Sequence, residues 1–390
     1  MARLKEYNGH YCESEYEYAF IGFLEAEGWK YSSGNNISRV TKRDVLIADD
    51  FKKFIADTNP DLTEDEVIQI YDNVRLVGAE SDFATLHKVY GWMVNGVQFT
   101  TQDGLPRMIP LIDFDNWDKN IFRVVNQFTV EYTNNGQKEN RRPDVLLFVN
   151  GMPLCVIELK NPADANATIY DAWEQINIRY WRDIPHLLHY CPLACISDGV
   201  KTRLGTVRTP YEHFYAWRRV NEGDAVSTLP FAETETMIKG VYAPERFMEI
   251  FRDYIYFQDS IYDSDEVEII CRYPQFFAAK LLKQSIVNSV VTRSGKGGTY
   301  FGATGCGKTY TMAFLARQLA LRCTDIPEIG SPTIILIVDR DELQKQGSKL
   351  FTKSKEFLNL GEVSVVKNRT QLRQELGARP VSYTHLTLPT

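Results

Sequence analysis

The sequence predicts an α/β protein with more than one domain. Three observations predict this class. Short alternating apolar runs are interspersed with segments whose apolar residues recur at helical spacing. Two apolar runs in the stretch 141–162, RRPDVLLFVNGMPLCVIELKNP, flank an Asn-Gly dipeptide and therefore indicate a β-hairpin. A glycine-rich loop at 302–309 lies between an apolar stretch and an amphipathic helix.

Helices are predicted from apolar periodicity and from start and stop signals. The first, at 14–27, ends at a Gly-Trp break, and the stretch 44–74 is split into two helices by an Asn-Pro pair. Thr63 and Glu66 form a capping box for the second of these two helices. Further helices are predicted at 163–182, from 238 onwards and directly after the glycine loop.

Strands are predicted where apolar residues alternate or form short runs. They comprise GVQFTT at 96–101, RVVNQFTVEYT at 123–133, both arms of the hairpin, LACISDG at 193–199 and the run before the glycine loop. The acidic and aromatic segment 254–268 is predicted to mark a domain boundary.

Composition excludes several classes of protein. No apolar run approaches the roughly 20 residues that cross a bilayer, and the N-terminal residues lack the features of a signal peptide. The seven cysteines include no CxxC pair, so we expect a cytoplasmic chain with reduced thiols and no zinc site. The net charge of −7 restricts any contact with DNA to local basic clusters, such as Arg141-Arg142 and Arg218-Arg219. Solvated surface is an equal explanation of both clusters.

The hairpin carries charges where apolar side chains would pack better. Asp144 and Glu158 lie on its two arms, and carboxylates are the ligands that Mg²⁺ prefers in proteins. Lys160 is two residues beyond Glu158 and therefore projects from the same face. Its ammonium would orient or help to deprotonate an attacking water, or stabilise charge on a phosphate. The alternative is a structural ion pair at the rim of the sheet.

Register decides whether the two carboxylates can share an ion. With a regular two-residue turn at Asn150-Gly151, Asp144 would face Ile157, and Glu158 would point to the opposite face of the sheet. Shared coordination requires Asp144 opposite Glu158. We therefore predict a three-residue turn or a single bulge in one strand.

The hairpin sequence RPDVLLFVNGMPLCVIELKNP resembles the nuclease core of the restriction (R) subunits of Type I restriction endonucleases, which have the PD-(D/E)xK fold. The resemblance extends over most of the chain, because AWEQINIRYWRDIPHLL, MIKGVYAPERFMEIFRDYIYF and the glycine loop occur in the same order as in that family. It implies a mixed sheet flanked by helices and then a partial RecA-like motor domain of the superfamily 2 helicase type.

The resemblance also assigns roles in the nuclease site. It implies that Asp144 and Glu158 bind the metal and act in catalysis together with Lys160. Glu17 would be the accessory carboxylate, although Glu13 and Glu15 are alternatives on the same helix. It further assigns Gln175 and Tyr180 to the family's Q-x-x-x-Y motif. Here they are five residues apart, and an i,i+5 pair diverges on a regular helix, so either a π-bulge absorbs the extra residue or one of them has lost the role.

The glycine loop, GATGCGKT, matches the G-x-x-x-x-G-K-[ST] pattern of a P-loop. In such a loop the backbone N–H groups surround ATP phosphates, so the predicted nucleotide site comprises Gly302, Thr304, Gly305, Gly307, Lys308 and Thr309. Lys308 would reach the β- and γ-phosphates, and Thr309 would ligate Mg²⁺.

Two further segments resemble helicase motifs. RYPQFFAAKLL resembles the adenine-reading Q motif, with Gln275 as the reader, but a glutamine at a helix start explains this position equally well. TIILIVDRDELQKQ at 333–346 resembles motif Ia, with Arg340 and Gln344 as DNA contacts and with an N-cap role as the alternative for Asp339. No later apolar run ends in Asp-Glu, so we expect the motor to be incomplete.

These observations predict an endonuclease domain at 1–235, a helical connector at 236–284, part of a RecA-like domain at 285–380 and a tail at 381–390 that resembles translated adapter sequence. The expected function is Mg²⁺-dependent cleavage of double-stranded DNA, coupled in a longer protein to ATP-driven translocation. The resemblance implies methylation (M) and specificity (S) subunits as partners and no membrane. The alternatives are the same nuclease fused to another helicase, of a repair or Type III-like system, and a non-catalytic docking module.

Overall fold

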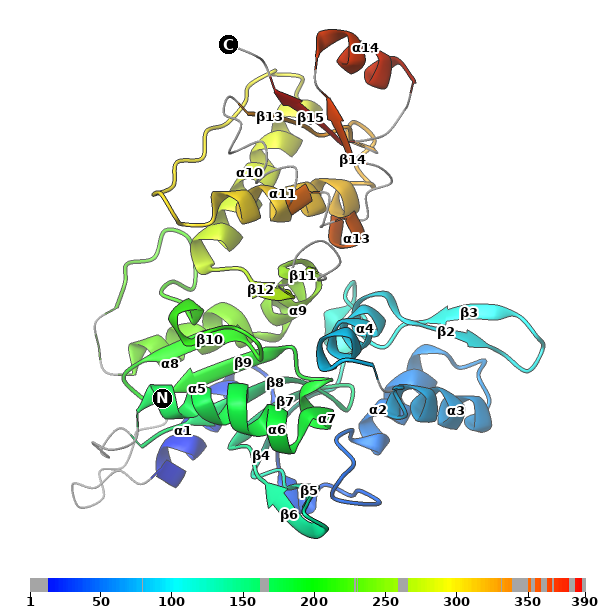
Figure 1. Ribbon diagram of the computed structural model, residues 1–390, viewed down its shortest axis with the longest axis vertical. Coiled ribbons are helices and arrows are strands. Elements are labelled where there is room, and N and C mark those ends of the chain that lie inside the picture. Colours follow the sequence, from blue (N-terminus) through cyan, green and yellow to red (C-terminus); the bar gives the residue numbers. More distant parts are fainter. Residues whose placement is uncertain are drawn as a thin grey trace. The chain divides into compact units, whose positions relative to one another are not determined.

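The structure is a computed structural model, and it divides into two compact units, Met1–Arg252 and Asp253–Thr390 (Figure 1). It describes residues 13–78, 80–161, 168–227, 229, 231–258, 266–330, 332–338, 350–351, 355–358, 363–366, 368–378 and 383–387. Residues 236–252, which the sequence places in a connector, lie in the first unit. The finer boundaries at 235 and 284 stay predictions.

The first unit is built around a six-stranded mixed sheet. Its spatial order is β1-β4-β7-β8-β9-β10, in which β1 is parallel to β4, β8 is parallel to β9, and the other neighbours are antiparallel. The strands are β1 (Lys30–Ser33), β4 (Phe122–Asn126), β7 (Val145–Val149), β8 (Met152–Leu159), β9 (Leu193–Ser197) and β10 (Thr202–Thr206). The mixed α/β character predicted from the sequence is confirmed.

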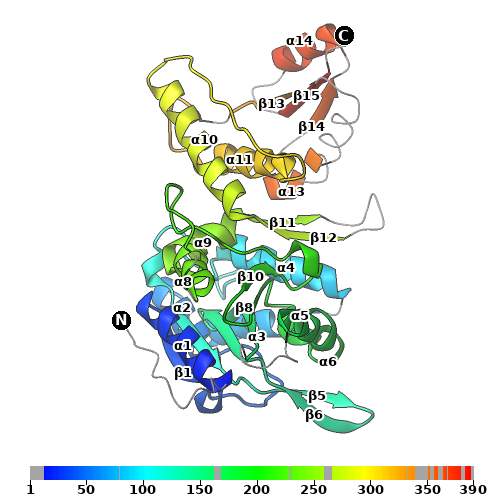
Figure 2. The same ribbon diagram turned by 90° about the vertical axis from the view of Figure 1, so that its left-hand side faces the viewer.

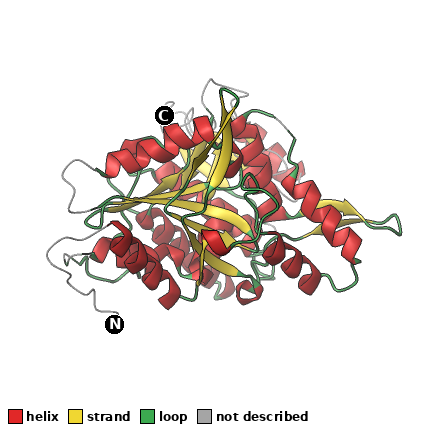
Figure 3. Cartoon of the chain, turned by 90° about the horizontal axis from the view of Figure 1, so that it is seen from below, coloured by secondary structure: helices red, strands yellow, loops and turns green. Residues whose placement is uncertain are grey.

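Helices cover both faces of this sheet. Every residue of β7 and β8 is buried, as expected for central strands with a helical layer on each side. Figure 2 shows α5 and α6 on one side and α1 and α8 on the other, and Figure 3 shows both layers from below. The flanking helices are α1 (Glu13–Ala26), α5 (Ile169–Glu174), η3 (Gln175–Tyr180), α6 (Trp181–Asp183), α7 (Pro185–Leu188), α8 (Ala232–Met237), η5 (Ile238–Tyr242) and α9 (Pro244–Asp253).

A helical subdomain is inserted between β1 and β4. It contains α2 (Ala48–Thr58) and α3 (Glu64–Arg75), and the predicted capping box at Thr63 and Glu66 is formed. Helix α4 (Asp82–Asn95) was not predicted from the sequence. It leads into a two-stranded hairpin of β2 (Val97–Thr100) and β3 (Pro106–Ile109).

A second hairpin, β5 (Val130–Asn134) and β6 (Gln137–Arg141), links β4 to β7. It forms a sheet of its own and projects beyond the six-stranded sheet (Figure 1 and Figure 2). The predicted continuous stretch RVVNQFTVEYT is therefore two strands in two sheets. The break falls at Gln127, whose positive φ of 53° ends β4.

The second unit contains the glycine loop. The hairpin β11 (Ile255–Gln258) and β12 (Val267–Ile270) precedes α10 (Tyr273–Val291) and α11 (Lys308–Arg322). The parallel sheet β13-β15-β14 follows, formed by Ile335–Val338, Tyr383–Thr387 and Val363–Val366. Helices α13 (Lys355–Leu358) and α14 (Arg369–Ala378) complete the described elements.

One predicted element of the second unit is wrong. The run before the glycine loop, at 297–301, is not a strand. A strand needs a hydrogen-bonded neighbour, and in the structure β15 pairs with both β13 and β14 and fills the position between them. The prediction that 381–390 lies outside the native fold stays a prediction, and the residues of β15 belong to that stretch.

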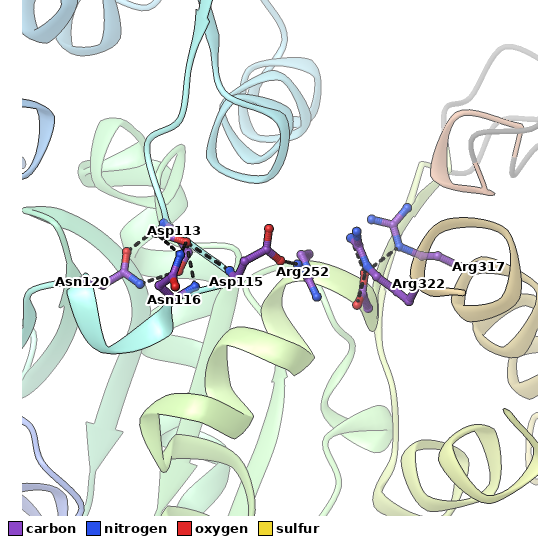
Figure 4. A network of polar contacts seen from close by, with 8 residues as sticks. Asp113, Asp115, Asn116, Asn120, Arg252, Arg317 and Arg322 are labelled. Carbon is purple, nitrogen blue, oxygen red and sulfur yellow. Dashed lines mark hydrogen bonds and ion pairs between the residues drawn. The ribbon is translucent and has the colours of Figure 1, made fainter. Parts of the chain in front are cut away.

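Ion pairs fix the last residue of the first unit, Arg252, and the first residue of the second unit, Asp253, each within its own unit (Figure 4). In the first unit, Arg252 pairs with Asp115 at 3.1 Å. In the second, the buried carboxylate of Asp253 accepts hydrogen bonds of 2.8–3.0 Å from Arg322, and Arg317 lies 3.4 Å away. Figure 4 also shows Asn116 and Asn120 gathered around Asp113 in the loop before β4.

Within the described residues no helix is both long and apolar enough to cross a membrane. The six cysteines described there are free thiols.

The β7–β8 hairpin has the irregularity predicted from its carboxylates. Asn150 and Gly151 both have positive φ, 50° and 76°, as a two-residue hairpin turn of the primed type requires. Near the turn Val149 faces Met152, but beyond a register shift Leu147 faces Cys155 and Val145 faces Ile157. The extra residue is Leu154. Of the two alternatives predicted, the bulge is correct and the three-residue turn is not formed.

We expect Gly151→Ala to destabilise the first unit far more than Gly136→Ala. Both glycines follow an asparagine in a two-residue hairpin turn, with φ of 76° and 80°, so both substitutions carry the left-handed strain of about 1 kcal/mol. A Cβ at Gly151 would lie 2.2 Å from the carbonyl oxygen of Ile47, whereas a Cβ at Gly136 would meet nothing within 4 Å. Urea unfolding of both variants measures the difference. Equal losses of stability would contradict this account of the turn.

Candidate active site

The bulge brings the two hairpin carboxylates to one place. Because the register beyond Leu154 pairs Val145 with Ile157, Asp144 stands opposite Glu158. The Oδ2 atom of Asp144 accepts a hydrogen bond of 2.8 Å from the backbone N–H of Leu159, and the backbone N of Asp144 lies 3.4 Å from Oε1 of Glu158. The register therefore meets the one condition set above for shared coordination, Asp144 opposite Glu158.

A chain of hydrogen bonds connects Glu158 to Lys160 through the following helix. Lys160 Nζ donates to Oε1 of Gln175 over 3.0 Å, and Gln175 Nε2 donates to the hydroxyl of Tyr180 over 2.8 Å. Tyr180 in turn donates to Oε1 of Glu158 over 2.6 Å. The four side chains thus lie together. Within the described residues no salt bridge joins Lys160 to either carboxylate, and its ammonium contacts Gln175 instead.

A π-helix makes this chain possible. Residues Gln175–Tyr180 form the π-helical segment η3, in which one extra residue per turn brings positions i and i+5 onto one face. Of the two alternatives predicted for the five-residue spacing, absorption by π-helical geometry is correct.

The π-helical segment is anchored on its other side. Trp173 Nε1 donates to the carbonyl of Thr209, Trp181 Nε1 donates to the carbonyl of Val207, and Asn177 Nδ2 donates to both carbonyls, all over 2.8–3.1 Å. The donors therefore recur along one side of the helix, against the turn that follows β10. These contacts fix the rotation of the helix and with it the direction of Gln175 and Tyr180.

Glu17 is the buried glutamate of α1. Its Oε1 accepts a hydrogen bond of 2.6 Å from Asn126, and its Oε2 accepts one of 2.7 Å from Gln127. The backbone N–H of Gln127 donates to the carbonyl of Asp144, so Glu17 is linked to the β7–β8 hairpin through one residue. Glu15 is half-buried, and the side chain of Glu13 lies outside the described residues.

Burial dominates the electrostatics of the carboxylate pair. It raises the pKa of Asp144, although the N–H of Leu159 and the charge of Lys160 act in the opposite direction. Burial and then the charge of Asp144 raise the pKa of Glu158 well above its ordinary range. Burial and the charge of Glu158 also raise the pKa of Tyr180, which keeps its hydroxyl a donor. Burial is therefore the largest influence on both carboxyls, and the charge of Lys160 offsets it only in part.

These residues fit a divalent cation. Glu158 Oε2 is buried and has no hydrogen-bond partner, and a bound cation would satisfy it. Asp144 and Glu158 would hold the ion, as predicted for Mg²⁺. Among the described residues, no three His, Cys, Asp or Glu side chains are grouped to bind one metal, so waters and phosphate oxygens would complete the coordination.

The glycine loop at 302–309 runs directly into α11. Gly305 and Gly307 have positive φ, 79° and 80°. Lys308 Nζ donates to the carbonyls of Gly302 and Ala303, both over 2.9 Å, and so spans the loop. Its ammonium is therefore held where phosphates would replace those carbonyls. Thr304 is exposed and Thr309 half-buried at the same loop.

Gln275 contacts this loop from α10. Its Oε1 accepts from the backbone N–H of Arg272, as a residue in the first turn of a helix does, while Nε2 donates to the carbonyl of Gly307 over 3.1 Å. Gln275 is only 4% exposed. It therefore combines the helix-start role with contact to the P-loop, and both predicted alternatives stay open. Asp339, Arg340 and Gln344 lie outside the described residues.

Comparison with known proteins also separates the region of the carboxylate pair from the region of the glycine loop. A family model described as the Type I restriction enzyme R protein N terminus matches residues 11–213, just over half of the chain. The chain belongs to this family. A second model, described as SWI2/SNF2 ATPase, matches residues 274–388 of the chain. The two matches include the carboxylate pair and the glycine loop respectively.

Curated relatives match across the two regions. A putative type I restriction enzyme endonuclease subunit of Methanocaldococcus jannaschii is 29% identical over 365 residues. The match covers 86% of this chain and 34% of the relative. The type I restriction enzyme HindI endonuclease subunit of Haemophilus influenzae is 29% identical over 389 residues, 95% of this chain and 35% of its own length. A type I restriction enzyme endonuclease subunit of Staphylococcus aureus is 27% identical over 271 residues, 69% and 26% respectively. The chain spans about a third of the length of the first two relatives.

Sequence reasoning missed three polar residues of the site. Asn126 and Gln127 hold Glu17, and Asn177 anchors the π-helix. Two amides at the end of an apolar strand are a signal for the first pair. For Asn177 the signal is an amide at the centre of a Trp-x₃-Asn-x₃-Trp pattern, which places all three side chains on one side of a helix.

We expect Glu158→Gln to stabilise the metal-free protein at neutral pH. The pKa of Glu158 is raised in the folded state above the ordinary 4.5. The folded state therefore holds its proton more tightly than the unfolded chain, so this group contributes most stability below pH 4.5 and loses it as pH rises through the folded value. The variant should gain relative to the parent by at most about 1.4 kcal/mol per pH unit.

Urea unfolding with chelator present, between pH 4 and pH 8 in about unit steps, measures this gain. Glu139→Gln is the control, because the pKa of exposed Glu139 is lowered by hydrogen bonds from Tyr132 and Asn134 and its pH dependence has the opposite sign. A Glu158→Gln variant that is less stable than the parent at every pH would contradict the buried-charge account.

Proposed function

We propose that this chain is the nuclease and ATP-binding part of a Type I restriction enzyme R subunit, with a PD-(D/E)xK nuclease domain that cleaves double-stranded DNA in a Mg²⁺-dependent reaction. The observation that carries the proposal is the connected set Asp144, Glu158, Tyr180, Gln175 and Lys160. Two opposed carboxylates with an ammonium on the same face match the requirements of phosphodiester hydrolysis. In the longer protein, cleavage would be coupled to ATP-driven translocation, with M and S subunits as partners.

The chain's own residues have distinct tasks in this reaction. When bound, a divalent cation polarises the scissile phosphate and lowers the pKa of a coordinated water. Tyr180 donates to Glu158 and so favours its ionised form. Gln175 occupies one N–H of Lys160 and leaves two for a phosphate oxygen or the attacking water. Water adds to phosphorus, the bond from phosphorus to a sugar oxygen breaks, and the departing oxygen takes a proton.

Asp144→Ala and Lys160→Ala should each abolish cleavage while the fold persists. Asp144 shares the metal site, and Lys160 stabilises charge at the phosphate, so each loss is expected to exceed about 100-fold. The assay follows nicking and linearisation of supercoiled plasmid by the purified chain with Mg²⁺. Asp57→Asn, which removes an exposed carboxylate on α2, is the matched control and should cut normally.

Circular dichroism and urea midpoints accompany each of these variants. Loss of cleavage together with loss of the fold would favour the structural ion pair. A parent chain that binds Mn²⁺ at Asp144 and Glu158 but never cuts would favour the docking module.

Lys308→Ala should weaken binding of a fluorescent ATP analogue by about tenfold or more. The substitution removes the ammonium that spans the loop and would face the β- and γ-phosphates. Lys296→Ala is the control, because it removes an exposed cation of the same unit that lies outside the loop. Fluorescence titration with Mg²⁺ present measures both dissociation constants. Equal affinities of the parent and Lys308→Ala would remove the nucleotide from the proposed function.

A further inference from the structure

Positive side chains gather beside the carboxylate pair although the chain as a whole is acidic. They lie on the loop before α2, on the β5–β6 hairpin and its continuation, and on α6. We refer to them as the basic strip: Lys42, Arg43, Lys138, Arg141, Arg142 and Arg182. All are exposed except half-buried Arg141.

Hydrogen bonds and ion pairs hold these segments together. The backbone N–H of Glu131 in β5 donates to the carbonyl of Lys42 over 3.0 Å, so the loop lies along the hairpin. Lys138 is paired with Thr133 across the hairpin, near its tip. Arg141 and Arg182 both contact the carboxylate of Asp183, at 2.6 Å and 2.8 Å. The strip therefore runs from the tip of the hairpin to its base.

The strip leads directly to the carboxylate pair. Arg142 is two residues before Asp144, and its charge acts to lower the pKa of that carboxyl. Asp144 is six residues after Lys138, so the chain between them spans at most about 20 Å. This length equals about six steps of duplex DNA at 3.4 Å each. A duplex held at the carboxylate pair would therefore have phosphates within reach of the strip.

The local charge is opposite to that of the whole chain. Six cations of the strip stand beside four carboxylates, those of Asp44, Glu131, Glu139 and Asp183. The chain as a whole has 44 basic and 51 acidic residues. One of the carboxylates, Asp44, is paired over 3.6 Å with Arg75, which is not a member of the strip. Within the strip, Lys138 is paired with Glu131 over 3.9 Å, and Arg141 and Arg182 share Asp183. The excess positive charge favours a polyanion.

The hairpin itself has a form that fits DNA. Every residue of β6 except Arg141 is exposed, and neither edge of the two-stranded ribbon joins another sheet. The ribbon projects from the body of the first unit (Figure 1 and Figure 2). A two-stranded β-ribbon is narrow enough to enter the major groove. Its outward side chains include the amides of Gln137 and Asn140 as well as Lys138.

We infer that the basic strip binds the phosphodiester backbone of duplex DNA, with the β5–β6 ribbon lying along a groove, and so directs one strand to Asp144 and Glu158. This inference rests on the proposed nuclease function and extends it. Contacts of this kind are independent of base sequence, because phosphates are the same at every position. They therefore suit an enzyme part that itself reads no sequence.

The experiment is a duplex-binding titration of the full chain without ATP and with chelator, so that no cleavage occurs. A fluorescein-labelled duplex of about 30 base pairs is followed by fluorescence anisotropy at several salt concentrations. The test variant is Lys42→Ala/Arg43→Ala/Lys138→Ala, which removes three exposed cations that have no catalytic role. We expect affinity to fall at least tenfold, equally for unrelated sequences, and the salt slope to decrease by about one per cation removed.

The matched control removes the same charge elsewhere in the first unit, as Lys53→Ala/Lys88→Ala/Lys239→Ala. It should bind like the parent. Unchanged affinity and salt slope in the test variant, or no binding of duplex by the parent at low salt, would overturn the inference. Asp144→Ala separates the two proposals, because it should keep strip-dependent binding while cleavage is lost. If instead the parent binds through the strip but never cuts, the proposed nuclease function fails and the binding surface stands.

Discussion

The register shift at Leu154 is the constraint on which the candidate site depends. Without it, the regular turn at Asn150-Gly151 would place Glu158 on the face of the sheet opposite Asp144. The turn itself cannot move, because the side chain of Asn150 bonds to Leu111 and Asn120, and Gly151 lies against the backbone of Ile47. The hairpin is therefore fixed at its turn. The extra residue Leu154 shifts the register beyond the turn, so that Glu158 stands opposite Asp144.

A second inserted residue acts in the same way on the facing helix. The π-helical segment η3 brings Gln175 and Tyr180 onto one side, and the contacts to Val207 and Thr209 prevent the helix from rotating. In both elements a regular backbone would separate side chains that the chemistry needs together. π-helical turns and β-bulges each disturb the hydrogen-bond ladder locally, so the convergence of these side chains is obtained at some loss of regular backbone bonding.

Much of this arrangement is predictable from residues alone. The demand that Asp144 and Glu158 share a face predicts the bulge. The π-helix, as one of two alternatives, follows from the five-residue spacing of Gln175 and Tyr180 only together with the motif that the family resemblance supplies. Both predictions use local periodicity, which a sequence reports directly. What could not be predicted depends on partners distant in sequence. The amides that hold Glu17 come from another strand, and the run at 297–301 pairs with no neighbour among the described residues. Helix α4 is different, because it buries Phe83, Leu86, Tyr90 and Met93 at helical spacing, and this signal was present in the sequence.

The site is also a problem of charge balance that the protein leaves incomplete. The carboxylates of half-buried Asp144 and buried Glu158 together with one ammonium leave one net negative charge, and a phosphodiester adds another. A divalent cation brings the total to zero, which neither a monovalent ion nor another single lysine would do. The unpaired Oε2 of Glu158 fits such a cation, and burial raises the pKa of both carboxyls in the protein alone. The basic strip does not offset this charge, since the pKa of Asp144 stays raised although the charge of Arg142 acts to lower it. It acts instead on the approach of DNA, where exposed charges are effective over about 10 Å at moderate salt. Attraction of the substrate and neutralisation of the reacting phosphate are therefore assigned to different groups, so the first can be weakened by substitution without altering the second.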